Sequence, residues 1–152
     1  MPYFTHRFPV RLGMALLLTA MTLTACGGGE KKPTAAEAGT TLKTHILELL
    51  KEVNAQNIKI IDSGGKKIPC GEEKIKYTFA ATGQDTAPQT KPTALNAQLL
   101  GALNEFADYK MTNPESTALR AVNESTRTSI EFGSNKNGQY VVRGETECLS
   151  QS

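Results

Sequence analysis

Apolar residues recur at helical spacing in two segments of the chain. Within 41–56 they stand at offsets 0, 4, 7, 8 and 11, and a set within 93–110 has the same offsets. Such a stripe covers one face of an amphipathic helix. The pattern predicts two helices, with apolar positions Leu42, Ile46, Leu49, Leu50 and Val53 in the first and Leu95, Leu99, Ala102, Leu103 and Phe106 in the second.

The start of the first helix is marked by two conflicting signals. Thr34 and Glu37 have the spacing of a capping box, which favours a start near residue 35. Gly39 favours a later start near Thr41, because glycine weakens a helix interior. The second helix is expected to end before Asn113-Pro114, since the residue before a proline avoids the helical conformation.

Five other segments have the character of strands: 58–61, 72–82, 117–122, 127–132 and 139–147. The segment 72–82 alternates, which is typical of a half-buried strand. Asn137-Gly138 between the last two segments is a strong hairpin signal. The alternation places Ile75, Tyr77, Phe79 and Ala81 on one face and Lys74, Lys76 and Thr78 on the other.

The resulting order, α-β-β-α-β-β-β, predicts an α+β fold. Hairpin connections imply an antiparallel sheet of four to five strands. Two helices with one apolar stripe each are expected to cover one face of it in a two-layer domain. The other face would then be exposed, at positions that include Lys76, Glu131 and Arg143.

The N-terminal segment has the layout of an export signal. Arg7 and Arg11 precede an apolar run over 12–23, and no acid occurs before Glu30. This run is shorter than the roughly 20 residues of a spanning helix. We therefore interpret 1–25 as a signal peptide. An uncleaved anchor, a buried helix, and a plain secreted protein cut near Ala25 are the alternatives.

Leu23-Thr24-Ala25-Cys26 resembles the lipobox of bacterial lipoproteins. The resemblance implies that Cys26 carries a covalent diacylglyceryl group and becomes the mature N-terminus. Two acyl chains suffice for stable anchoring. The protein would then lie on the extracytoplasmic, outer face of the cell membrane, with 26–40 as a glycine-containing tether and 41–152 as a single domain.

Removal of the signal peptide changes the charge balance. The whole chain of 152 residues has 17 basic and 15 acidic side chains, a net charge of +2. Loss of Arg7 and Arg11 leaves 15 of each. The apparent basic bias therefore belongs to the signal, and we expect no nucleic-acid partner.

The chain has three cysteines, and Cys26 is assigned to lipid. Cys70 and Cys148 remain, and the compartment outside the membrane permits disulfides. We predict a Cys70–Cys148 bridge, which would place the 72–82 and 139–147 strands side by side in the middle of the sheet. Two distant cysteines and His45 do not make a four-ligand metal set, so no metal or other cofactor is expected.

The chain shows no convincing catalytic motif. Asp62-Ser63-Gly64-Gly65 resembles the nucleophile segment of trypsin-like proteases only superficially and is better explained as a turn. His45 is expected to be an ordinary, partly exposed helix residue. Glu145 and Glu147 favour cross-strand charge pairing over an acid–base dyad. Lys66, Lys67, Lys74 and Lys76 form the densest basic cluster, a candidate contact for anionic lipid or cell-wall polymer.

The mature chain is similar to small uncharacterised lipoproteins of high-GC Gram-positive bacteria. The likeness rests on the glycine tether, Pro69-Cys70-Gly71 and Thr146-Glu147-Cys148-Leu149, and it implies an anchored α+β head without a known activity. We expect a non-enzymatic binding or interaction module whose partner is an envelope protein, a cell-wall polymer or a small ligand. An envelope hydrolase with an unrecognised site and a structural or surface-exclusion protein are the alternatives.

Overall fold

The computed structural model describes residues 31–87, 89–112 and 119–151, so the signal segment and Cys26 lie outside it. This part of the chain contains two helices, α1 (Ala35–Glu52) and α2 (Pro92–Phe106). The strands are β1 (Gln56–Asp62), β2 (Ile68–Gly71), β3 (Lys74–Lys76), β4 (Thr78–Gln84), β5 (Lys110–Met111), β6 (Leu119–Asn123), β7 (Thr128–Phe132), β8 (Gln139–Thr146) and β9 (Leu149–Ser150).

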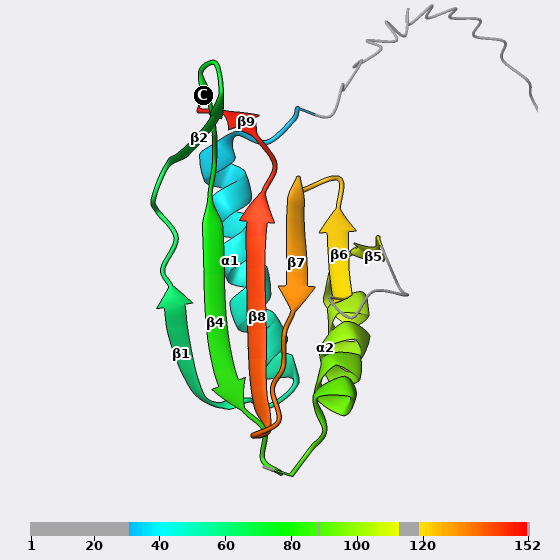
Figure 1. Ribbon diagram of the computed structural model, residues 1–152. Helices are drawn as coiled ribbons and strands as arrows, with labels where there is room; N and C mark the ends of the chain where they lie inside the picture. Colours follow the sequence, from blue (N-terminus) through cyan, green and yellow to red (C-terminus); the bar gives the residue numbers. More distant parts are fainter. Residues whose placement is uncertain (1–30, 88, 113–118, 152) are drawn as a thin grey trace, which may run out of the picture. The chain divides into compact units, whose positions relative to one another are not determined.

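Six of these strands form one antiparallel sheet in the order β1-β4-β8-β7-β6-β5 (Figure 1). A smaller sheet has the order β2-β3-β9. The α+β class is confirmed, but the expected count of four to five strands is too low. The additional strands β2, β5 and β9 are two to four residues long, too short for side-chain alternation to reveal them.

Both helices cover the same face of the large sheet, as predicted (Figure 1). Gly144 of β8 lets α1 approach closely, since a Cβ there would lie 2.5 Å from Leu42 Cδ1 and 2.8 Å from the Ser129 carbonyl oxygen. The core between the layers consists of the helix stripes and the inward side chains of the sheet, Phe79, Ala81, Ala121, Ile130, Phe132, Tyr140 and Val142. Tyr77 and Phe106 are only partly buried.

The capping box decides where α1 begins. Thr34 accepts a hydrogen bond from the Glu37 backbone, and the Glu37 carboxylate accepts from the Thr34 backbone at 2.8 Å. Residues 35–40 are therefore helical, which corrects the expected extent of the tether. Gly39 lies inside the helix, and its lack of a side chain leaves room for Tyr77. A Cβ at this position would lie 3.1 Å from the Tyr77 ring.

The helix α2 ends earlier than expected. It stops at Phe106, since Ala107 adopts an extended conformation and β5 follows. Asn113 and Pro114, the expected stop signal, lie outside the described residues. The chain thus has room for a strand at the sheet edge before the 113–118 segment.

The Cys70–Cys148 disulfide is confirmed, as is the pairing of the strands that it was expected to join. The predicted 72–82 strand is two strands, because the chain passes from the small sheet to the large one at Tyr77. There the Tyr77 N–H donates to Thr146 Oγ1 at 3.0 Å. The bridge joins β2 to the segment between β8 and β9, so it closes the small sheet.

The predicted hairpin at 135–138 is also present. Asn135 and Gln139 form an isolated bridge that extends the β7–β8 pair, and Gly138 adopts φ 67°. Because this left-handed conformation favours glycine, the Asn-Gly step sets the turn that aligns β7 with β8. That alignment fixes which side chains of β7 and β8 lie opposite each other.

Candidate functional site

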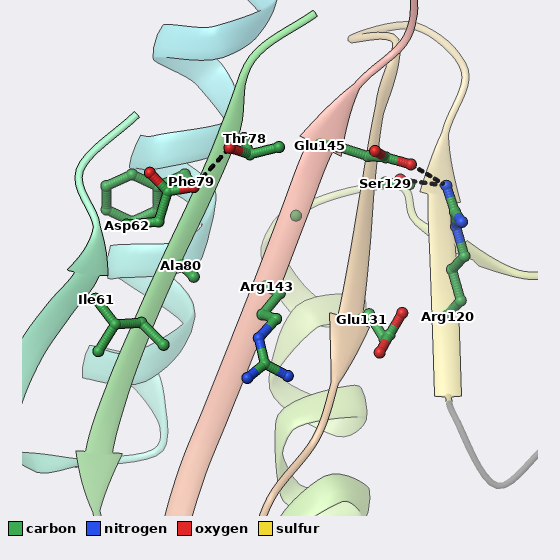
Figure 2. Close-up of a pocket in the computed structure, with 11 residues that line it drawn as sticks. Ile61, Asp62, Thr78, Phe79, Ala80, Arg120, Ser129, Glu131, Arg143 and Glu145 are labelled. Carbon is green, nitrogen blue, oxygen red and sulfur yellow. Dashed lines mark hydrogen bonds and ion pairs between the residues drawn. The ribbon is translucent and has the colours of Figure 1, made fainter. Parts of the chain in front are cut away.

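The face of the large sheet that the helices leave uncovered carries a hollow of about 480 Å³ (Figure 2). Its floor contains small side chains, among them Thr78, Ala80 and Ser129. Longer ones surround them: Ile61 and Asp62 of β1, Arg143 and Glu145 of β8, Glu131 of β7 and Arg120 of β6. We refer to this surface as the open face.

Strand alternation places these side chains. Ile130 and Phe132 of β7 are buried beneath the helices, so Ser129 and Glu131 point to the open face. Antiparallel register then aligns neighbouring strands, because residues directly opposite share a face. One row across the sheet reads Ala80, Arg143, Glu131, Arg120, and the next reads Thr78, Glu145, Ser129, Val122.

Glu145 is the charged centre of the second row. Its carboxylate accepts from Lys76 Nζ at 2.8 Å and from Arg120 Nη2 at 2.9 Å. Arg120 Nη2 also donates to Ser129 Oγ at 2.9 Å. The hydrogen bond from Lys76, helped by Arg120, lowers the pKa of Glu145 despite partial burial. The cross-strand pairing predicted for this residue is therefore present, with Lys76 and Arg120 as partners.

Glu147, which directly follows β8, forms a separate ion pair. Its carboxylate accepts from Arg127 Nη1 at 3.0 Å. The two glutamates therefore face different cations and do not form an acid–base dyad with each other. Neither glutamate forms an ion pair with Arg143.

Arg143 and Glu131 differ from their charged neighbours. They are exposed and directly opposite each other on β8 and β7. Within the residues that the structure describes, neither takes part in an ion pair. In Figure 2 their side chains extend from adjacent strands without meeting. The open face thus presents one cation and one anion that remain available to a partner.

Asp62 closes the hollow on the β1 side. Its Oδ1 accepts from the Gly64 N–H at 3.0 Å, and its Oδ2 accepts from Thr78 Oγ1. Gly64 and Gly65 have φ of 71° and 78°. The segment that superficially resembles a protease nucleophile is therefore a glycine turn, as predicted, and Asp62 orders it.

A second hollow of about 510 Å³ shares Arg120, Ser129 and Glu145 with the first. It extends toward the disulfide and includes Lys76. The open face is thus hollowed along much of its length, and the Lys76–Glu145–Arg120 cluster stands between the two depressions.

The four lysines singled out from the sequence have different surroundings. Lys76 is half-buried and held by Glu145. Lys66 and Lys67 lie exposed between β1 and β2, and Lys67 Nζ donates to Gln151 at 3.3 Å. Lys74 is exposed on β3, opposite Ser150. Three of the four thus surround the small sheet, and the fourth belongs to the open face.

His45 lies on the other side of the large sheet, in a polar chain between α1 and β7. Its Nδ1 is 3.0 Å from the Tyr109 hydroxyl, which is 2.7 Å from Thr128 Oγ1. Burial lowers the pKa of His45 and raises the pKa of Tyr109. Sequence reasoning missed this contact because Tyr109 is 64 positions away, and no local pattern joins the two.

These positions limit the chemistry that the described residues support. The imidazole of His45 and the carboxylates of the open face lie on opposite sides of the sheet, so they do not share one cleft. Among residues 31–87, 89–112 and 119–151, no group of three His, Cys, Asp or Glu side chains is placed to hold a metal ion. Neither described helix has the length and apolar character needed to cross a membrane.

Comparisons with known protein families, with curated proteins and with solved structures find no match to this chain.

Proposed function

We propose that this protein is an extracytoplasmic lipoprotein, anchored through Cys26, whose domain is a non-enzymatic interaction module. The observation that carries the proposal is the open face. One side of the large sheet is buried by α1 and α2, while the other is hollowed and presents Arg143 and Glu131 without ion-pair partners among the described residues. Such a surface supplies shape and charge for recognition.

A protein partner fits this surface better than a deeply bound small molecule. The hollow is broad and continues into a second one, whereas small-molecule sites enclose most of the ligand surface. The exposed Ile61 at the edge, with 55% of its surface accessible, adds an apolar contact. We therefore place the partner contact on the open face and regard the lysines around the small sheet as a secondary contact with anionic lipid or cell-wall polymer.

The anchor is tested with Cys26→Ser in the full chain. We expect the variant to keep its uncleaved signal and to migrate as the larger precursor without lipid, because the modified sulfur is absent. The measurement is membrane fractionation with immunodetection of size. A variant that stays membrane-bound with the wild-type size would contradict lipid anchoring.

The contact surface is tested by photo-crosslinking in cells. A photoreactive residue at Glu131 or Lys76 of the open face is expected to capture a protein, and one at Lys51 or Glu105 on the helices is the control. Equal capture from both sides, or capture from the helices alone, would overturn the open face as the contact surface.

A further inference from the structure

We infer that the partner of the open face is a second copy of this chain on the same membrane, an inference that rests on the proposed function. Arg143 and Glu131 carry opposite charge and are directly opposite each other on neighbouring strands. In a two-fold contact, residue i of one copy meets residue j of the other, and j meets i. One such pair therefore supplies two intermolecular ion pairs.

The position of this pair in the sheet favours one symmetry axis. The strand order places three strands on each side of the line between β8 and β7. A two-fold axis along that line, parallel to the strands, stacks the two sheets face to face in the aligned manner of β-sandwiches. Each β8 then faces the β7 of the other copy, and each β4 faces its β6.

The rows of the open face are compatible with this stacking. Arg143 meets Glu131, and Ala80 meets Arg120. In the next row Glu145 meets Ser129, and Thr78 meets Val122. None of these four contacts between described residues joins like charges. The hollow over Ala80 receives the long Arg120 side chain of the other copy, and Val122 of that copy covers Thr78.

The same axis agrees with anchoring to one membrane. Because the axis is parallel to the strands, both copies of α1 begin at the same end of the pair. Eight residues lie between Cys26 and Ala35, and these nine chain steps reach at most about 32 Å. Both anchors can therefore enter one bilayer, which an axis perpendicular to the strands would prevent by turning one domain end over end.

The size of the surface predicts a weak interaction. Six strands about 4.8 Å apart, five of them five to eight residues long and β5 two, cover roughly 500 Å², below the roughly 800 Å² per partner of a standard interface. We expect pairing to depend on confinement in the membrane, which raises the effective concentration.

Charge reversal tests the second copy directly. Two differently tagged full chains are expressed together, each with a photoreactive residue at Val122, and crosslinked pairs are counted. R143E alone or E131R alone makes both intermolecular contacts repulsive, so we expect pairing to fall at least about tenfold. R143E combined with E131R in separate copies makes both contacts attractive again, and pairing is expected to return. K51E and E105R on the helices are the matched controls.

Each outcome separates the two claims. Recovery in the mixed pair, with the Val122 crosslink mapped to β4 of the other copy, supports the inference, because a different partner would not gain from the mixture. A mixed pair no better than either single variant overturns it. Val122 crosslinks that go only to another protein overturn the second copy and leave the open face as a contact surface. Absence of any protein crosslink from Val122, Glu131 and Lys76 contradicts both claims.

Discussion

The two faces of the large sheet are built from the same strands but follow different rules. On the covered face, Phe79, Phe132 and Tyr140 have at most 2% of their surface exposed. On the open face the corresponding positions carry small residues at the floor and charged residues around them. The comparison separates stability from recognition: the covered face holds the fold together, whereas the open face can change with little cost to it.

Polar groups show the same division. On the covered side Thr128 and Thr146 are buried and hydrogen-bonded, Thr128 through the Tyr109 hydroxyl and Thr146 through the Tyr77 backbone. A buried polar group without a hydrogen-bond partner destabilises the fold, so the folded state requires these contacts. On the open face Arg143 and Glu131 are in water and need no partner to fold. A solvated charge there adds little to the free-energy cost of folding and remains available for binding.

The largest expected effect contrasts two adjacent residues of β7. Phe132→Ala removes a core ring that is 1% exposed and should lower the free energy of unfolding by about 3–5 kcal/mol. Glu131→Ala, one position away on the open face, should change it by less than about 0.5 kcal/mol. Urea unfolding of the disulfide-bonded domain measures both. Similar losses in the two variants would show that the open face also contributes to the core.

A smaller effect contrasts two glycines. Gly144→Ala places a methyl group 2.5 Å from Leu42 Cδ1 and 2.8 Å from the Ser129 oxygen, so we expect a loss of about 1–3 kcal/mol from overpacking. Gly101→Ala in α2 has nothing within 4 Å and should gain up to about 1 kcal/mol from helix propensity. Thermal unfolding followed by circular dichroism checks the opposite signs. A tolerated Gly144→Ala would mean that α1 can move away from β8 freely.

Much of the fold could be predicted because its signals are local. The apolar stripes of α1 and α2, the Asn-Gly step and the alternation of 72–82 each lie within one segment. The pairing of β4 with β8 followed from the cysteines. The break at Tyr77 could not be predicted, since it depends on Thr146 of another strand. The same holds for the extra strands, which exist only as partners of longer ones.

The candidate site was predicted only in part. Glu131 and Arg143 are exposed sheet positions as predicted, whereas Lys76, also expected to be exposed, is half-buried and held by Glu145. The role of Arg120, which crosses from β6 to Ser129 and Glu145, depends on the register of three strands. The hollow itself arises from small residues on adjacent strands, and a single sequence does not reveal which strands are adjacent. Lipidation of Cys26 stays a prediction.

The smallest expected effect contrasts how the two faces respond to acid. Burial lowers the folded-state pKa of His45 on the covered side. The unfolded chain then binds more protons, so the contribution of His45 is present above its ordinary pKa of about 6.5 and is lost as the pH falls through that value toward the folded one. The pKa of Glu145 is lowered by Lys76 and Arg120. Its contribution is present above the ordinary glutamate pKa of about 4.3 and is lost only below it.

Two substitutions separate these windows in a series of unfolding midpoints measured from pH 8 to pH 3. His45→Gln should reduce the fall in the unfolding midpoint between roughly pH 7 and pH 5, since glutamine does not titrate there. Glu145→Gln should leave the midpoint between pH 7 and pH 5 unchanged and should reduce the fall in the midpoint below roughly pH 4.5. Glu124→Gln, an exposed turn residue, controls for loss of a carboxylate as such. If His45→Gln leaves the fall in the unfolding midpoint between pH 7 and pH 5 unchanged, the imidazole is not the acid-sensitive group of the covered face.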